Sequence, residues 1–439
     1  MGEYISILGI ILSVILFVFL CYRKVNVVLV SLFGSIFISL MSGMNPFYAI
    51  SETYMSGLGG FIVKYGLIFV MSALFGKVMD ATGSARKIAL SLASVTSRTR
   101  HCKYWTVFLL PVLYMVLSYV GVSGTAIIFT VIIIAKDMFK ELDIPWALYP
   151  YGSAGIFPAL ILGGSAYSSN IIVTDGMGIS LYDGMAFSVI LFLAAIAGLM
   201  LLLFFDIKAC EKRSEGFLPS GADIEKYGIS LGDHPDPDSQ NLPGIITAAV
   251  PLFTPLILIL LLKANVVAAL AAAITVCILL NIRRISDLIT VLSQGAVMSY
   301  GPLITVSAAV GYAGVIKATS GFEMILRGLD NLPPLLSAVL LGMMTSAAVA
   351  NSGSYISPIV SILSEKYAAA GISAATASRM ALVSGCAYSM PHNSGIVNGL
   401  SLARLDYKRG VITYFKTTFI PGIAALAVGI VLISLKVFV

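Results

Sequence analysis

The hydrophobic pattern of this 439-residue chain consists of apolar runs of about 20 residues, the length that a helix needs to cross the hydrocarbon layer of a membrane. Short polar segments separate the runs. The pattern predicts an all-helical, polytopic membrane protein. The first run, residues 4–22, follows the acidic Glu3 and shows no small-residue cleavage site, so we expect a retained span and not a signal peptide.

The apolar runs fall into two series that resemble each other. The first series predicts spans at 4–22, 25–43 and 55–79, an amphipathic stretch at 83–97, an apolar pair at 104–122 and 125–140, a long segment at 145–173 and a span at 180–205. The second predicts spans at 244–263, 264–282 and 290–316, an amphipathic stretch near 320–330, a pair at 333–350 and 355–368, a segment at 373–400 and a span at 411–438.

Short sequence matches between the two series indicate a duplication. The matches are "ATGSARKIALSL" (81–92) with "ATSGFEMILRGL" (318–329), "VSGT" (122–125) with "NSGS" (351–354), and "GSAYS" (164–168) with "GCAYS" (385–389). They occur in the same order, and the offset between the paired segments decreases gradually along the chain, as small insertions and deletions would produce. We therefore expect residues 1–205 and 244–439 to form two repeats.

The repeats are expected to be inverted in the membrane. Each repeat has an odd number of crossings, whether its apolar pair is a re-entrant hairpin or two full spans, so the second repeat enters from the opposite side. Residues 206–243 between them are polar and carry more acidic than basic residues. We interpret them as a solvated cytoplasmic linker and not as a domain.

Composition agrees with this class of protein. Hydrophobic residues make up 58% of the chain and charged residues 11%. The five cysteines are scattered without the spacing of a zinc site, so neither a metal site nor a disulfide framework is indicated. The net charge of +6 does not call for a nucleic-acid partner if the basic residues follow the topology.

The distribution of Lys and Arg predicts the orientation. With the amino terminus outside, seven of the 27 basic residues fall on the outer side, which leaves 20 on the cytoplasmic side, as the positive-inside rule requires. The seven are Lys64, Lys263, Lys317, Arg327, Lys366, Arg379 and Lys436. We expect a multi-pass protein of the cytoplasmic (inner) membrane, with lipid around its spans.

Four polar, glycine-containing stretches at membrane depth mark the candidate site: "YVGVSGT", "AVANSGSY", "LGGSAYSSN" and "SGCAYSMPHNSG". Irregular backbone at this depth is tolerated only where it is buried or lines a cavity. Two hairpin tips and two interrupted helices would direct helix amino termini, which favour anions, at one point. The candidate substrate-binding residues are Ser123, Thr125, Ser168, Ser169, Asn170, Asn351, Ser352, Ser354, His392, Asn393 and Ser394. Close packing of small residues is the alternative explanation for each stretch, and the equivalent tyrosines Tyr167 and Tyr388 fit either role.

His392 raises a question about coupling. Histidine changes its charge near neutral pH, so His392 could carry a coupling proton beside an anionic substrate. A neutral histidine that hydrogen-bonds the broken helix or the substrate is the alternative. No cofactor is indicated other than the coupling ion.

The chain resembles the gluconate permease (GntP) family of the larger ion transporter superfamily. The resemblance rests on "FGKVMDATGSARKIA", "GYAGVIKATSG" and the late histidine stretch. The Pro391, His392 and Asn393 sequence is closer to 3-hydroxybutyrate-type members than to gluconate permeases. The resemblance implies proton-coupled uptake of a small hydroxylated monocarboxylate, a homodimer, and a scaffold along which hairpins and broken helices move as an elevator-like transport unit.

Other functions remain open at this point. Sodium coupling is the first alternative, because Ser, Asn and unwound carbonyl oxygens also ligate a hard cation. A passive channel would conduct without coupling. An enzyme that uses His392 as a base is not expected, because the sequence has no HExxH, no GxSxG and no acidic pair at depth.

Overall fold

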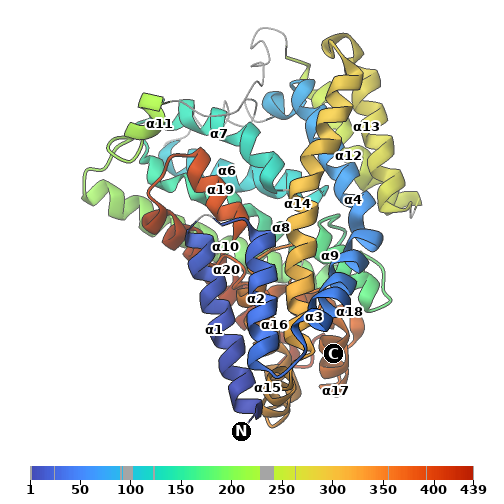
Figure 1. Cartoon of the computed structure of the whole chain (residues 1–439). Coiled ribbons are helices and arrows are strands. Elements are labelled where there is room, and N and C mark those ends of the chain that lie inside the picture. The colour runs from blue at the N-terminus through green and yellow to red at the C-terminus, as the bar shows by residue number, and fades with distance from the viewer. Residues whose placement is uncertain are drawn as a thin grey trace.

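The computed structural model describes residues 2–23, 25–88, 91, 102–121, 124–227, 242–262, 264–353, 355–391 and 393–438. Every regular element with given bounds in these ranges is a helix (Figure 1). The helices up to the linker are α1 (Gly2–Tyr22), α2 (Val27–Met41), α3 (Pro46–Tyr48), η1 (Ala49–Tyr54), α4 (Met55–Ala81), α6 (Cys102–Tyr119), α7 (Gly124–Glu141), η2 (Trp146–Gly155), α8 (Ile156–Ile161), α9 (Ser168–Gly176) and α10 (Met185–Lys212).

The linker contains the short helix α11 (Ala222–Tyr227), and further α-helices follow it among the described residues. These are α12 (Ile245–Leu262), α13 (Val266–Asn281, continued by the 3-10 turn η3, Ile282–Arg284), α14 (Leu288–Lys317), α15 (Ser320–Asp330), α16 (Pro334–Val349), α17 (Val360–Ala369), α18 (Ala374–Ser384), α19 (Ser394–Leu402) and α20 (Tyr407–Ser434).

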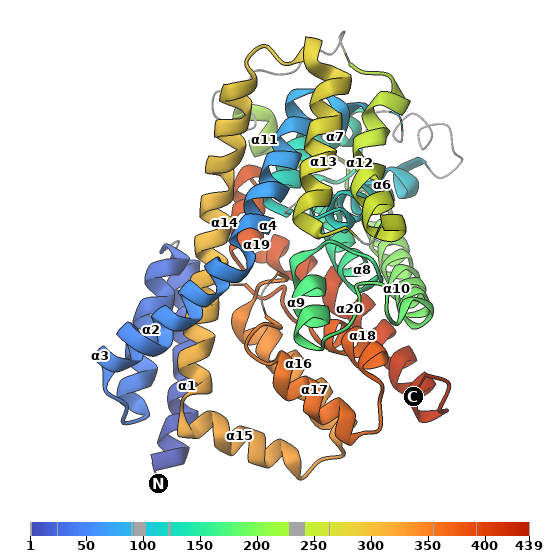
Figure 2. The ribbon, with the colours of Figure 1, turned by 90° about the vertical axis from the view of Figure 1, so that its right-hand side faces the viewer.

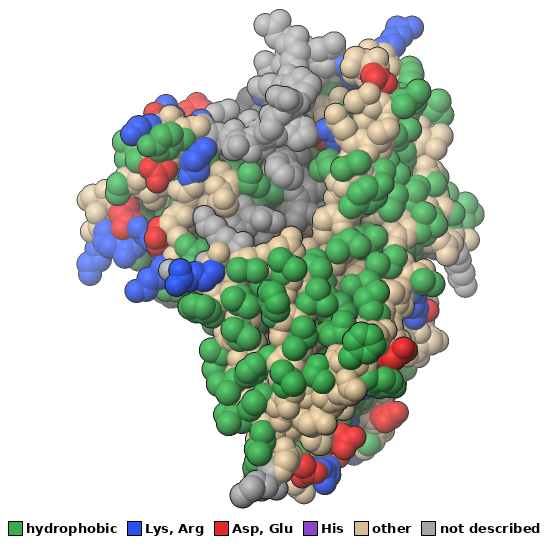
Figure 3. Space-filling model, in the orientation of Figure 1, with side chains coloured by type: hydrophobic (Ala, Val, Ile, Leu, Met, Phe, Trp, Pro, Cys, Tyr) green, Lys and Arg blue, Asp and Glu red, His purple; other side chains and the backbone are tan. Residues whose placement is uncertain are grey.

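Within the described residues, six helices are long and apolar enough to cross a membrane. They are Pro46–Ala81, Cys102–Tyr119, Met185–Lys212, Val266–Arg284, Leu288–Lys317 and Tyr407–Ser434, and four shorter apolar helices accompany them. Large hydrophobic side chains such as Ile11, Ile15 and Phe33 are exposed on α1 and α2, and this surface forms an apolar face in Figure 3. The expected all-helical, multi-pass membrane protein is confirmed.

Two long helix pairs organise the molecule. α4 packs along α14, and α10 packs along α20. Close approaches show that α4 and α14 are antiparallel: a Cβ atom added to Gly57 would lie 3.1 Å from the Gly311 Cα atom, and one added to Gly295 would lie 3.1 Å from the Leu74 Cα atom. Glycine permits this close contact because it has no side chain. Figure 2 shows the two helices running side by side in opposite directions.

Two hairpins and two interrupted helices lie among the other helices. α6 and α7 pair as the first hairpin, and α16 and α17 pair as the second. The chain is non-helical at 162–167, between α8 and α9, and again at 385–391 and 393, between α18 and α19. The structure differs from two expected segments. Within the long segment expected at 145–173, residues 146–155 form a 3-10 helix that includes Pro150. The run expected at 355–368 becomes helical only from Val360, where α17 begins.

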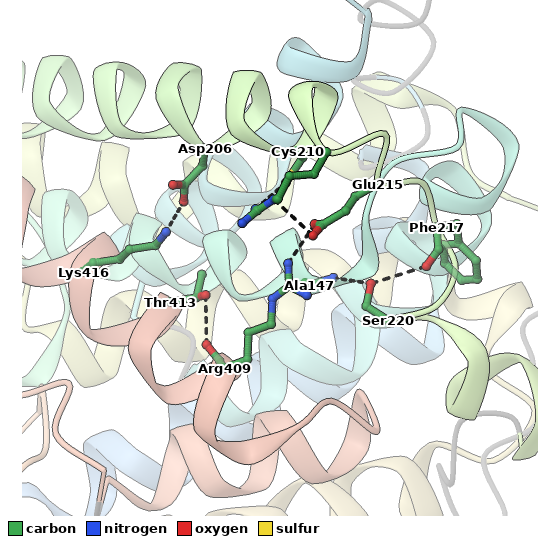
Figure 4. A network of polar contacts seen from close by, with 10 residues as sticks. Ala147, Asp206, Cys210, Glu215, Phe217, Ser220, Arg409, Thr413 and Lys416 are labelled. Atoms are coloured by element: carbon green, nitrogen blue, oxygen red, sulfur yellow. Dashed lines mark hydrogen bonds and ion pairs between the residues drawn. The ribbon is translucent and has the colours of Figure 1, made fainter.

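The linker region is less solvated than expected up to residue 227. α10 continues to Lys212, and the Phe217 and Ile224 side chains are buried. The Ala147 amide donates a hydrogen bond to the Ser220 hydroxyl, and an ion pair joins Glu215 to Arg409 (Figure 4). The two apolar side chains explain why this part of a polar segment packs on the helices.

Candidate functional site

A cavity of about 600 Å³ lies where the hairpin tips, the helix breaks and the α4–α14 pair meet. Ser72 of α4 and Ser299 of α14 form one wall. Gly121 and Asn351, at the two hairpin tips, also line the cavity, and a Cβ atom added to Gly121 would lie 3.5 Å from the Ser72 hydroxyl oxygen. Among the described residues that line the cavity there is no Lys, Arg, Asp or Glu, so its polar surface consists of hydroxyl, amide and backbone groups.

The first helix break, residues 162–167, is hydrogen-bonded to both hairpin tips. The Ala166 amide donates to the Tyr119 carbonyl oxygen at 2.8 Å, beside the first tip. The Ser168 hydroxyl donates to the Gly353 carbonyl oxygen at 3.1 Å, in the second tip. The Tyr167 and Ser352 hydroxyl oxygens are 2.7 Å apart. The break therefore joins the tip of one half to the tip of the other.

The helices that follow the two breaks begin differently. The α9 helix starts at Ser168, and its N-cap residue Tyr167 makes no side-chain capping bond. The α19 helix is capped by Asn393, whose side-chain oxygen accepts hydrogen bonds from the Gly395 and Ile396 amides. Since a helix start carries partial positive charge, the uncapped start of α9 is the better place for a carboxylate.

Both hairpin tips turn through a left-handed backbone conformation. Gly121 has a φ of 92° and Ala350 has a φ of 46°. Glycine adopts this conformation freely, whereas alanine in it is strained by its Cβ atom. Strain of this kind concentrates at functional sites, and both residues lie beside the cavity.

The structure sorts the candidate residues from the sequence into three groups. Ser168, Asn351, Ser352 and Asn393 line the cavity, as do Tyr167 and Tyr388. Ser169 and Asn170 are fully buried outside the cavity lining. Ser123, Ser354 and His392 lie outside the described residues, and the side chains of Thr125 in α7 and Ser394 in α19 are likewise not described.

The Asn170 side chain is hydrogen-bonded to other groups of the protein. Its amide nitrogen donates to the Leu162 carbonyl oxygen at 3.0 Å, and its amide oxygen accepts from the Arg379 guanidinium at 2.9 Å. Asn170 thus satisfies a freed carbonyl group of the broken helix and does not line the cavity.

The sequence reasoning missed the wall of the cavity formed by the long helices. Ser72 on α4, with Ser299 and Thr305 on α14, lies within otherwise apolar spans. Their polarity was a signal, but the sequence alone does not tell which side of a span faces a cavity. Ser153 and Ser389 also line the cavity, and Ser389 donates to the Thr418 hydroxyl at 2.9 Å.

The helical membrane fold and the polar cavity at the helix breaks define a membrane transporter. Residues 5–300 match the model of the GntP family permeases, so the chain belongs to this family. An uncharacterised transporter of Bacillus subtilis (strain 168), YxjC, is 24% identical over 95% of this chain and 97% of its own length. The crystal structure of the Alcanivorax borkumensis YdaH transporter aligns over 88% of each chain with a TM-score of 0.47 and 14% identity. The protein is thus a transporter and not an enzyme.

Proposed function

We propose that this permease imports a small hydroxylated monocarboxylate, such as gluconate or 3-hydroxybutyrate, together with protons across the cytoplasmic membrane. The observation that carries the proposal is the meeting of both hairpin tips and both helix breaks at one cavity whose described lining residues are polar or apolar but carry no Lys, Arg, Asp or Glu. Hydroxyl and amide groups suit a hydroxylated substrate, and the uncapped start of α9 suits its carboxylate.

The proposed substrate contacts are Ser168, Asn351, Ser352 and Asn393, with Ser123, Thr125, Ser354, His392 and Ser394 kept from the sequence prediction. His392 remains the candidate for the coupling proton because of its titration near neutral pH. Sodium coupling is the alternative. The closeness of Pro391, His392 and Asn393 to the 3-hydroxybutyrate-type pattern favours that substrate over gluconate.

The proposed architecture is a pair of inverted repeats. Equivalent features recur in the same order in both halves. Asn26 and Asn265 cap α2 and α13 with the same bond to the second helical amide. Gly57 in α4 and Gly295 in α14 lie near the starts of their helices, and each contacts the later part of the other helix. A left-handed residue follows in each hairpin tip.

The exchanged helix contacts agree with a twofold relation between the repeats. α2 packs against α14 while α13 packs against α4, and α9 packs against α17 while α19 packs against α7. We propose that α1, α2, α4 and α12 to α14 form a scaffold in a homodimer, and that the hairpins and broken helices move along it as an elevator-like unit.

The proposed orientation has the amino terminus outside. In Figure 1 the amino terminus and α11 of the linker lie at opposite ends of the molecule. Since the linker region carries Lys208, Lys212, Arg213 and Lys226, the positive-inside rule favours a cytoplasmic position for it.

The proposal is tested by uptake of radiolabelled gluconate and 3-hydroxybutyrate into proteoliposomes with an imposed pH gradient and no sodium. Accumulation of one acid that a protonophore abolishes is the expected result, and His392→Ala should then uncouple or abolish it. Uptake that depends on sodium at fixed pH and membrane potential would identify sodium, and not the proton, as the coupling ion. Equilibration without accumulation would favour a passive channel instead.

A further inference from the structure

Arg379 of α18 is a fully buried arginine in the interior of the helical assembly. None of its surface is exposed, and it is among the largest fully buried side chains of the described residues. The sequence prediction counted it among the basic residues of the outer side. Its position inside the protein is therefore unexplained by topology, and burial of a charge is costly unless the charge has partners or a function.

The guanidinium donates only to neutral acceptors. Its Nη1 atom donates to the Asn170 side-chain oxygen at 2.9 Å, and its Nη2 atom donates to the Leu181 carbonyl oxygen at 2.8 Å. Nε and Nη2 both donate to the Asp183 carbonyl oxygen, at 3.0 and 2.6 Å. These bonds join a helix of the second half to the first half.

No ion pair neutralises Arg379 within the part of the chain that the structure describes. The Asp183 carboxylate forms no ion pair with the guanidinium and accepts a hydrogen bond from the Ser180 amide at 2.9 Å instead. The positive charge of Arg379 is therefore stabilised but only partly compensated. The electric field of such a charge is weakly screened in a buried environment.

Asn170 connects this charge with the cavity. It lies in the first turn of α9, shortly after Ser168, which lines the cavity. Through its amide nitrogen it also holds the Leu162 carbonyl oxygen at the end of α8. Arg379 thus supports the start of α9 from the side away from the cavity lining.

We propose that Arg379 is a positioning residue for substrate recognition. It fixes the start of α9 through Asn170, and its partly compensated charge makes the cavity prefer a carboxylate over a neutral analogue of the same shape. This inference rests on the proposed function, because it explains how a cavity with no Lys, Arg, Asp or Glu among its described lining residues selects an anion.

The test compares binding of each acid with binding of its neutral amide. Purified full-length protein in detergent is titrated with gluconate, 3-hydroxybutyrate, gluconamide and 3-hydroxybutyramide. The variants are Arg379→Gln and Arg379→Lys, and Lys366→Gln is the matched control because Lys366 is paired with Asp330. Arg379→Gln should lower the acid-to-amide affinity ratio by about tenfold or more. The control should leave the ratio within about twofold of wild type, because its charge is already paired and partly screened by solvent.

Arg379→Lys separates charge from geometry. It keeps the charge but loses the planar fork that binds several acceptors, so it should weaken acid and amide alike and keep their ratio within about threefold. The inference is overturned if Arg379→Gln weakens acid and amide equally, which is the result of a purely structural role. If Arg379→Gln does not fold, Arg379→Lys decides the question. An acid-to-amide affinity ratio that falls by about tenfold in Arg379→Lys, although the charge is kept, overturns the inference as well. Failure of the wild-type protein to bind either acid would instead overturn the proposed function itself.

Discussion

The Tyr167 hydroxyl lies 2.7 Å from the Ser352 hydroxyl, although 185 residues separate them in the chain. The contact joins the helix break of the first half to the hairpin tip of the second. Tyr388, which occupies the equivalent position in the second helix break, also lines the cavity. Its hydroxyl is buried and has no hydrogen-bond partner among the described residues. The two tyrosines therefore differ in what their hydroxyl groups do.

This difference predicts that the same Tyr→Phe substitution has different effects on stability at the two positions. Tyr167→Phe removes a bond between the two halves and should lower the free energy of unfolding by about 0.5–1.5 kcal/mol. Tyr388→Phe removes no bond within the described protein and should leave the unfolding temperature near that of wild type. If its hydroxyl binds the substrate, KM for the transported acid should rise several-fold.

Thermal unfolding in detergent and uptake kinetics in proteoliposomes measure the two effects, and each variant is the control for the other. A Tyr388→Phe protein with wild-type KM would show that this hydroxyl is not a substrate contact. A Tyr167→Phe protein with wild-type stability would show that the bond to Ser352 contributes nothing measurable.

The left-handed conformation of Ala350 predicts a strong dependence on side-chain shape. Ala350→Val should destabilise the protein by at least about 1 kcal/mol, because a branched side chain fits this conformation poorly. Ala350→Gly is the control and should be tolerated, since glycine adopts positive φ freely. Unfolding temperatures of the two variants decide the matter, and equal temperatures would contradict the strain at this tip.

Glu215, which follows α10, predicts a pH dependence of stability. Burial acts to raise the pKa of this carboxyl, but a hydrogen bond from Arg409 and the charges of Arg409 and Arg213 outweigh burial, so the pKa lies below 4.5, its ordinary value. A lowered pKa means that the charged form is favoured in the folded state. The stabilisation is therefore present above pH 4.5 and is lost as the pH falls through the folded pKa.

Glu215→Gln should thus be less stable than wild type near neutral pH, by less than about 1 kcal/mol because the site is partly exposed. The difference in the free energy of unfolding between wild type and Glu215→Gln should become smaller at pH values below the ordinary pKa of 4.5. Unfolding measured at about pH 6.5 and about pH 3.5 provides the comparison, and a gap that is the same at both values would exclude the ion pairs as its cause.

The proposed orientation, with the amino terminus outside, predicts which residues an impermeant thiol reagent reaches. Ser214 follows α10 and Asn331 follows α15, and both are exposed. In a cysteine-free background, Ser214→Cys should react only after the membrane is permeabilised, whereas Asn331→Cys should react in intact cells. The reverse pattern would place the amino terminus in the cytoplasm.

The helices of the fold could be predicted because apolar runs of spanning length specify them without reference to tertiary contacts. The break at 162–167 and the break between α18 and α19 could also be predicted, since Gly and Ser at membrane depth mark irregular backbone. The packed part of the linker region could not, because two apolar residues, Phe217 and Ile224, form no recognisable pattern within a polar segment.

The candidate site was predicted only in part for a similar reason. Ser168, Asn351, Ser352 and Asn393 lie in the polar stretches that the sequence marks, whereas the wall of the long helices depends on how α4 and α14 are rotated in the assembly. Arg379 was assigned by counting charges on each side of the membrane. A count of this kind does not distinguish a basic side chain in the aqueous phase from one buried between helices.

The first helix break has one further consequence, which concerns leakage. Because residues 162–168 are bonded to the first tip through Ala166 and to the second through Tyr167 and Ser168, each tip is attached by hydrogen bonds of its own. The contact of the break with one tip can therefore separate while its contact with the other tip persists. Under the proposed coupled transport, a permease whose tips separate one at a time would expose its contents to one compartment without a continuous aqueous path, so the coupling-ion gradient would not be dissipated.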